Sequence, residues 1–101
     1  MSQLQSPIPK RKLGRTEFVV FEVGFGTAPL GELFEKVSEA DAQATLEAAW
    51  ASGIRYYDTS PFYGYGLSEH RVGHFLRQRT DEEFALSTKV GRVFKASRHP
   101  D

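Results

Sequence analysis

The sequence predicts an α/β fold, part of a (β/α)8 TIM barrel preceded by a β-hairpin. Short apolar runs rich in aromatic and β-branched residues alternate with longer segments of helical periodicity. Such alternation predicts parallel strands joined by right-handed crossovers. An open doubly wound sheet also fits this order, but it usually carries a glycine-rich dinucleotide loop after its first strand.

Neither of the two glycine pairs fits that loop. Gly24-Phe25-Gly26 is followed by Pro29 instead of a helix. Gly64-Tyr65-Gly66 does precede a helical pattern, but Glu69 stands in the sixth place of the motif. A carboxylate there would repel a diphosphate from the positive end of the helix. The barrel is therefore favoured over the open sheet.

The N-terminal part predicts strands. In residues 10–27, KRKLGRTEFVVFEVGFGT, two β-rich pieces flank residues 14–16 and predict a hairpin that continues into a strand ending near Thr27. Residues 1–9, which include two prolines, predict a loose leader ahead of one partial barrel domain over residues 10–101. Pro29 and Gly31 then interrupt regular structure.

A helix is predicted next. Ser38, with Asp41 three residues later, is typical of a helix start, and Gly53 is typical of the position just past a helix end. Between them, apolar residues recur on one helical face: Ala42, Leu46, Ala49 and Trp50.

The second half repeats the pattern. IRYYD, residues 54–58, predicts a strand, and a loop follows to residue 67. Ser68 predicts the cap of a second helix, whose apolar face comprises Val72, Phe75 and Leu76. EFALSTKV, residues 83–90, predicts the last strand, with residues 91–101 as loop.

Composition excludes several classes of function. Among the 101 residues the net charge is zero, which argues against nucleic acid or an anionic membrane surface as partner. Cysteine is absent, so disulfides, thiolate metal sites and thiol nucleophiles are excluded. The N-terminus lacks the apolar region of a signal peptide, and the longest apolar run is residues 18–21. A cytoplasmic protein is expected.

Three residues suggest proton-transfer chemistry. Asp58 and Lys89 end two neighbouring strands, at the rim where barrel enzymes carry their active sites. Period-two alternation places both side chains on the lumen face, so we expect them to pair. Tyr63 follows in the adjacent loop. An ordinary phenol has a pKa of about 10, and a neighbouring ammonium lowers it by stabilising the phenolate. Lys89 would thus make Tyr63 a better proton donor.

Each of these residues, taken alone, is more often structural than catalytic. Two histidines, His70 and His74, lie four apart as zinc ligands on one helix would, but no glutamate stands between them as in a metalloprotease helix. They fall opposite the apolar helical face, so a solvated surface and no metal site are predicted.

Three long segments, GFGTAPLGELF, IRYYDTSPFYGYGLSEHRVGHFL and LSTKVGR, resemble the aldo-keto reductase superfamily. The nearest branch contains D-threo-aldose (L-fucose) dehydrogenases and pyridoxal dehydrogenases, and the similarity covers residues 12–92. The resemblance implies that the chain is the N-terminal portion of a (β/α)8 TIM barrel with the β-hairpin at the barrel floor. It further implies hydride transfer between NAD or NADP and an aldehyde, ketone or sugar. It also implies catalytic roles for Asp58, Tyr63 and Lys89. On the nicotinamide side it implies cofactor-binding roles for Gly26, Thr27, Ala28 and Asp58.

The resemblance also shows a departure from the family. Its catalytic histidine and most of its cofactor-binding residues would lie past residue 101, and the context of His99 does not fit that histidine. We therefore expect an N-terminal fragment of an oxidoreductase, truncated after the third barrel strand. With two unpaired sheet edges, the isolated chain is expected to fold poorly or to self-associate, and to turn over no substrate. The alternative is an inactive interaction or regulatory module derived from the same fold.

Overall fold

The computed structural model describes residues 7–92. Along this part of the chain the elements are β1 (Lys10–Lys12), β2 (Val19–Phe21), β3 (Phe25–Gly26), the 3₁₀ helix η1 (Ala28–Gly31), α1 (Glu39–Ala51), β4 (Tyr56–Asp58), α2 (Leu67–Leu76), the 3₁₀ helix η2 (Arg77–Arg79) and β5 (Ala85–Ser87). Most of the predicted leader and His99 lie outside the described residues. Within them, no helix is long and apolar enough to cross a membrane.

The strands form two sheets, one of β1 and β2 and one of β3, β4 and β5 in that order. Both pairings in the three-stranded sheet are parallel. The register places Gly26 beside Asp58 and Asp58 beside Ser87, so the carboxyl ends of the three strands meet at one edge. This arrangement confirms the predicted parallel sheet with alternating helices. Asp58 lies at the centre of that edge.

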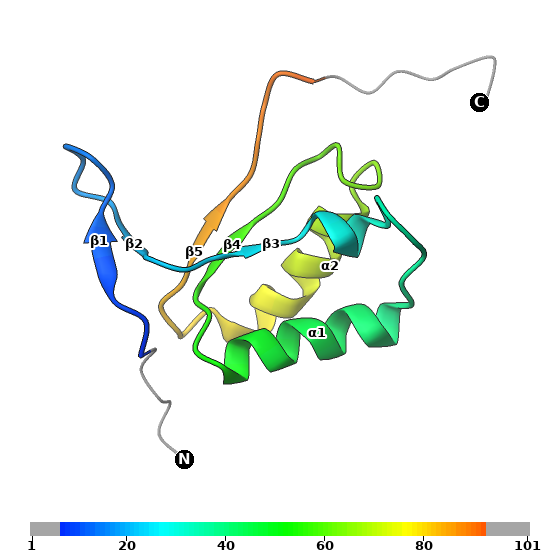
Figure 1. The fold of residues 1–101 in the computed structure, drawn as a ribbon, viewed down its shortest axis with the longest axis horizontal. Helices are drawn as coiled ribbons and strands as arrows, with labels where there is room; N and C mark the ends of the chain where they lie inside the picture. The colour runs from blue at the N-terminus through cyan, green and yellow to red at the C-terminus, as the bar shows by residue number, and fades with distance from the viewer. Residues whose placement is uncertain (1–6, 93–101) are drawn as a thin grey trace.

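The predicted hairpin is also confirmed. β1 and β2 pair antiparallel, and the turn between them includes Gly14 with a φ of 57°. The hairpin stands beside the start of the parallel strands rather than their ends (Figure 1). A 2.6 Å ion pair joins Lys10 to Glu83, just ahead of β5, and Phe21 is buried. This is the position that a hairpin at the barrel floor requires.

The predicted signals for α1 are confirmed at both ends. The Ser38 hydroxyl accepts a hydrogen bond of 3.1 Å from the backbone N–H of Asp41, which satisfies a donor that the helix leaves unpaired. Gly53 has a φ of 100°, the left-handed conformation that commonly follows a helix end.

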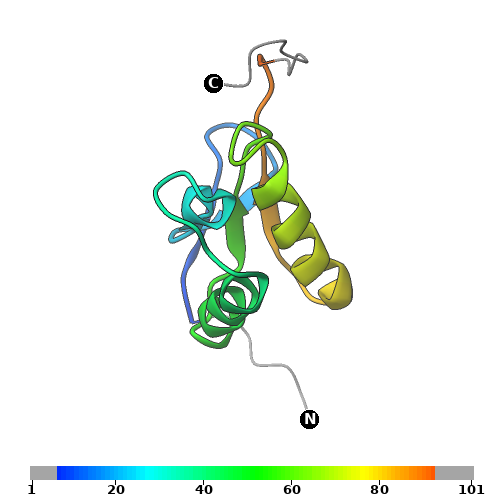
Figure 2. The ribbon, with the colours of Figure 1, turned by 90° about the vertical axis from the view of Figure 1, so that its right-hand side faces the viewer.

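Both helices lie against the three-stranded sheet, with α1 and α2 next to each other (Figures 1 and 2). Tyr57 is fully buried among the rings of Trp50 and Phe75, whereas its neighbours in β4 face the other side. The hydrophobic core comprises Leu30, Ala42, Leu46, Trp50, Tyr57, Val72, Phe75 and Leu76. Burial of this cluster fixes which face of β4 turns away from the helices.

The predicted cap of α2 is wrong. The helix begins at Leu67, and Gly66, with a φ of 96°, occupies the N-cap position. Ser68 lies inside the first turn and is fully buried. Its hydroxyl contacts the hydroxyls of Thr27 and Thr59, each at 2.7 Å. Because the Ser68 hydroxyl contacts residues at the ends of two strands, it does not cap its own helix.

The strands are shorter than predicted. The strand expected over residues 54–58 begins at Tyr56, because Ile54 still donates a hydrogen bond of 3.0 Å to Ala49 in the closing turn of α1. The strand expected over residues 83–90 contains only β5. Phe84, just before it, packs its ring edge-on against Trp50.

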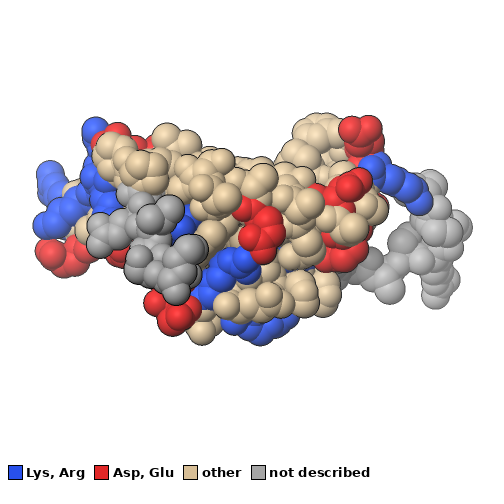
Figure 3. Space-filling model, turned by 90° about the horizontal axis from the view of Figure 1, so that it is seen from below, with Lys and Arg blue, Asp and Glu red and all other residues tan. Residues whose placement is uncertain are grey.

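Acidic and basic side chains are intermixed on the face seen in Figure 3. Each residue of the basic run in β1 has a carboxylate partner: Lys10 pairs with Glu83, Arg11 with Glu22 and Lys12 with Glu17. Two of these ion pairs lie within the hairpin, and the third joins it to Glu83, ahead of β5.

Candidate active site

Asp58 and Lys89 meet where the parallel strands end. The Lys89 ammonium donates a hydrogen bond of 2.8 Å to the Asp58 carboxylate and one of 3.0 Å to the backbone carbonyl of Thr59. The Ser87 hydroxyl donates to the other Asp58 oxygen at 2.6 Å. The pairing predicted from strand alternation is therefore present, and both carboxylate oxygens are engaged.

The two charged groups shift each other's proton affinity. Burial alone would raise the pKa of Asp58, but hydrogen bonds from Lys89 and Ser87, with the Lys89 charge, hold that pKa below its ordinary value. The hydrogen bond to Asp58 raises the pKa of Lys89, and interactions with Tyr63 raise it further. Lys89 is thus held as an ammonium and oriented by a carboxylate.

Tyr63 lies beside this pair. The Lys89 nitrogen sits 5.2 Å from the centroid of the Tyr63 ring, within the range of a cation–π contact. The loop that carries Tyr63 is tied locally: its N–H donates to the Ser60 carbonyl at 3.1 Å, and its carbonyl accepts from the Ser68 N–H at 3.2 Å. The structure brings the three predicted catalytic residues together around one ammonium.

The residues predicted on the cofactor side differ in what they can offer. Thr27 is fully buried, and both its N–H and its hydroxyl donate to the Asp58 carbonyl, at 3.0 and 2.8 Å. Gly26 is exposed, and a Cβ added there would meet open space. Ala28 begins η1 and is half-buried. A ligand therefore has room at Gly26, while Thr27 holds the end of β4 in place.

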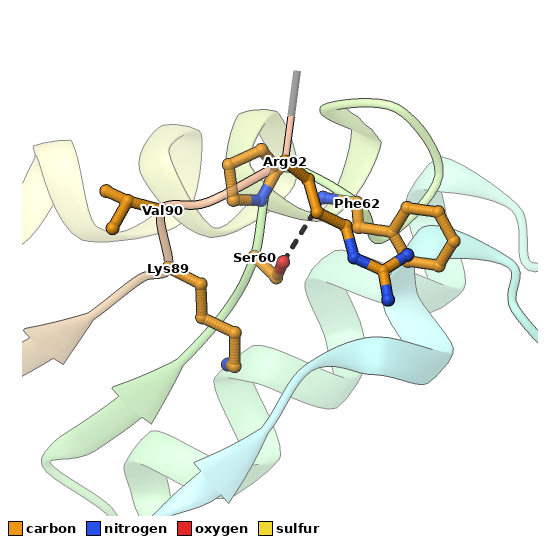
Figure 4. A pocket seen from close by; sticks show the side chains of 6 residues that line it. Ser60, Phe62, Lys89, Val90 and Arg92 are labelled. Atoms are coloured by element: carbon orange, nitrogen blue, oxygen red, sulfur yellow. Dashed lines mark hydrogen bonds between the residues drawn. The ribbon is translucent and has the colours of Figure 1, made fainter. Parts of the chain in front are cut away.

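A small hollow adjoins Lys89 at the ends of β4 and β5 (Figure 4). One wall comes from the segment after β5, where the Arg92 guanidinium lies 4.3 Å from the centre of the Phe62 ring. The other comes from the loop after β4, where the Phe62 N–H donates to the Ser60 hydroxyl at 3.2 Å. The hollow offers a basic and aromatic surface next to the ammonium.

The other tyrosines are placed differently from Tyr63. Burial raises the pKa of Tyr57 to about 12, and its hydroxyl donates to the Ile54 carbonyl at 3.0 Å in the core. Tyr56 shares the Asp58 face, and its hydroxyl lies 3.4 Å from that of Ser87. Tyr65 is 78% exposed, and its ring packs edge-on near Phe62. These positions confirm Tyr63 as the tyrosine next to Lys89.

His70 and His74 are exposed, as the helical wheel predicts. Among the residues that the structure describes, no group of histidine and carboxylate side chains could hold a metal ion.

Sequence reasoning missed two residues near the site. Ser68 joins the ends of β3 and β4 through its hydroxyl, which also donates to the Thr27 carbonyl at 3.1 Å. Arg71 is buried and reaches from α2 to the segment ahead of α1. Arg71 stands next to the apolar face of α2, and this position was the signal that could have predicted its burial. A buried arginine needs several hydrogen-bond acceptors, so contacts with another segment would then have been expected.

Comparison with known proteins establishes the family. The Aldo/keto reductase family model matches residues 22–100. The chain belongs to the aldo/keto reductase family. This result confirms the resemblance and, with it, the barrel fold of which the three parallel strands form a part.

Two curated relatives are identical to this chain at more than half of the aligned residues. Pyridoxal 4-dehydrogenase from Microbacterium luteolum is 55% identical over 89 residues, which cover 88% of this chain and 26% of the relative. D-threo-aldose 1-dehydrogenase from a Pseudomonas species is 53% identical over 73 residues, which cover 72% and 22%. The chain thus spans about a quarter of the length of these relatives.

A solved aldo-keto reductase has the same fold. The holo form of the Bacillus halodurans protein superposes with a TM-score of 0.74 at 36% identity, covering 87% of this chain and 28% of the other.

Proposed function

We propose that this chain forms the N-terminal part of an oxidoreductase that transfers hydride between NAD or NADP and a sugar or aldehyde. The observation that carries the proposal is the Lys89 ammonium, held 2.8 Å from the Asp58 carboxylate and 5.2 Å from the centre of the Tyr63 ring. Family membership supports the reaction class. Relatives named as dehydrogenases of pyridoxal and of D-threo-aldoses support the substrate class.

Tyr63 is the proton donor and acceptor in this proposal. When a carbonyl is reduced, the Tyr63 hydroxyl gives its proton to the carbonyl oxygen, and the Lys89 ammonium stabilises the phenolate that remains. When an alcohol is oxidised, the phenolate takes the hydroxyl proton. Asp58 keeps Lys89 protonated and pointed at the ring.

The room at Gly26 suits the nicotinamide end of a cofactor. Gly26, Thr27, Ala28 and Asp58 would hold it, with Thr27 acting through the Asp58 backbone. The nicotinamide ring supplies or accepts the hydride when it is bound. Tyr63 and Lys89 would then handle the proton.

The experiment uses the protein expressed from its complete reading frame. Consumption of NADH and NADPH is followed with aldoses and with aldehydes, for the wild type, Tyr63→Phe and Tyr65→Phe. We expect Tyr63→Phe to lower kcat by about 100-fold or more, the usual contribution of general acid–base catalysis. Tyr65→Phe removes a hydroxyl from the same loop and should stay within about twofold, because it keeps the ring that packs near Phe62.

Turnover that survives Tyr63→Phe would overturn the proposal. The remaining alternative is an interaction module of the same fold. Titration of the protein with NADH and NADPH, followed by nicotinamide fluorescence, distinguishes it from an oxidoreductase. A protein that binds neither NADH nor NADPH and shows no turnover belongs to that second class.

A further inference from the structure

Arg71 donates three hydrogen bonds, all of them to one segment outside its own helix. Its side chain lies on α2, and the residue is only 5% exposed. The guanidinium donates to the Leu30 carbonyl at 2.9 Å, to the Val37 carbonyl at 2.8 Å and to the Glu39 carboxylate at 2.9 Å. Arg71 thus fastens α2 to the chain between η1 and α1.

The two carbonyls stand at opposite ends of an irregular stretch. Leu30 belongs to η1, and Val37 immediately precedes the cap of α1. The planar guanidinium has several donors in a fixed fork, so one side chain can reach both carbonyls and a carboxylate together. A lysine ammonium has a single nitrogen and could not span them. Burial of the charge is tolerated because each of these donors meets an acceptor.

The segment that Arg71 holds forms the support behind Tyr63. A Cβ added to Gly31 would lie 2.5 Å from the backbone carbon and oxygen of Tyr63, far inside contact distance. A Cβ on Gly64 would in turn collide with the Gly31 carbonyl oxygen. The two loops therefore touch backbone to backbone, and any displacement of residues 30–31 displaces Tyr63.

We propose that Arg71 is a positioning residue for Tyr63. By holding the Leu30 carbonyl it fixes the Gly31 backbone on which Tyr63 rests, and so keeps the phenol next to the Lys89 ammonium. This inference rests on the proposed function, because it concerns the same proton donor. Misplacement of a reacting group by about 1 Å can lower a rate by roughly 100-fold.

The test compares Arg71→Lys with a matched control, Arg79→Lys, in the protein expressed from its complete reading frame. Arg79 follows α2, donates to the Phe75 carbonyl at 2.9 Å and pairs with Glu47, but its contacts are to the two helices. Both variants should lose stability in urea. Only Arg71→Lys should lower kcat, by about tenfold or more, while the Kd for NADH or NADPH stays within about twofold.

The split between kcat and cofactor affinity is a readout that a purely structural role would not give. When Tyr63 is displaced from its place beside Lys89, proton transfer slows while the cofactor still binds, so kcat should fall in Arg71→Lys and not in Arg79→Lys. Gly31→Ala, which pushes on Tyr63 directly, should reproduce the fall in kcat and replaces Arg71→Lys if that variant does not fold.

The failures are distinguishable. If Tyr63→Phe is inactive but Arg71→Lys and Gly31→Ala keep the kcat of Arg79→Lys, the positioning role is wrong and the proposed function stands. If Tyr63→Phe keeps the wild-type rate, the proposed function itself is wrong.

Discussion

Lys89 shows how a partly exposed residue can be oriented without much gain in stability. Its side chain is 47% exposed and that of Asp58 39% exposed, so solvent screens their attraction. Its ammonium nevertheless has the Asp58 carboxylate and the Thr59 carbonyl as acceptors, with the Tyr63 ring alongside. These contacts act chiefly on direction and on proton affinity, which are the properties that an acid–base site needs.

Substitution of Asp58 by asparagine tests this division at the residue scale. We expect Asp58→Asn to reduce the free energy of unfolding near neutral pH by less than about 1 kcal/mol. It should also bring the pKa of Lys89 back down toward its ordinary 10.5, because the raising hydrogen bond is lost. Urea denaturation of the protein from its complete reading frame gives the first quantity. Nuclear magnetic resonance of the methylated amine gives the second.

The pH dependence of that stability difference has a definite sign. The folded pKa of Asp58 is lowered, so its contribution is present above the ordinary value of 3.8 and disappears as the pH falls through the lower folded value. The folded pKa of Lys89 is raised, so its contribution is present below 10.5 and disappears as the pH rises through the higher folded value. A difference between wild type and variant that grows below pH 3.8 would contradict the ion pair.

At the scale of elements, Ser68 connects α2 to two strands. Ser68→Ala leaves the hydroxyls of Thr27 and Thr59 without their shared partner in a buried site. Loss of buried hydrogen bonds of this kind costs about 1–3 kcal/mol. Ser52→Ala, whose exposed hydroxyl donates to the Ala48 carbonyl one turn back, should cost less than about 0.5 kcal/mol.

Urea denaturation of the same protein measures both serine variants. If Ser68→Ala and Ser52→Ala lower the free energy of unfolding equally, the buried hydrogen bonds between α2 and the strand ends contribute no more to stability than one exposed hydrogen bond.

Sequence reasoning succeeds where contacts are local or are determined by strand order, and it fails at Ser68. The start of α1 was predictable because Ser38 and Asp41 are three residues apart and interact locally. The pairing of Asp58 with Lys89 was predictable because strand alternation and parallel order determine it. The role of Ser68 depends on Thr27, which lies 41 residues away, so a local pattern read it as a cap.

Arg71 belongs to the same group of misses. Its acceptors lie 32 to 41 residues earlier in the chain, and they are mostly backbone carbonyls, which carry no signal in the sequence. The extents of the strands were overestimated for a related reason. β-propensity marks residues that suit a sheet, but the ladder extends only as far as neighbouring strands pair, and β3 contains just two residues.

At the scale of the whole molecule, the three-stranded sheet is open on both sides within the described residues. β3 and β5 each pair only with β4 there. Leu86, in the edge strand β5, is 48% exposed, and Val90, in the segment after β5, is 98% exposed. Unpaired backbone groups with apolar side chains beside them favour pairing with another chain.

We therefore predict that residues 1–101, expressed alone, either melt over a broad temperature range or form oligomers, and that they turn over no aldose. The helices cover one face of the sheet and form the core there. The opposite face carries Asp58 and Tyr56, and the described residues supply no further barrel strands to cover it. The relatives are about four times as long as the aligned part of this chain. Circular dichroism melting, with size-exclusion chromatography at several concentrations, measures this. A sharp cooperative transition from a monomer would show that three strands and two helices suffice, and the edges would then need another explanation.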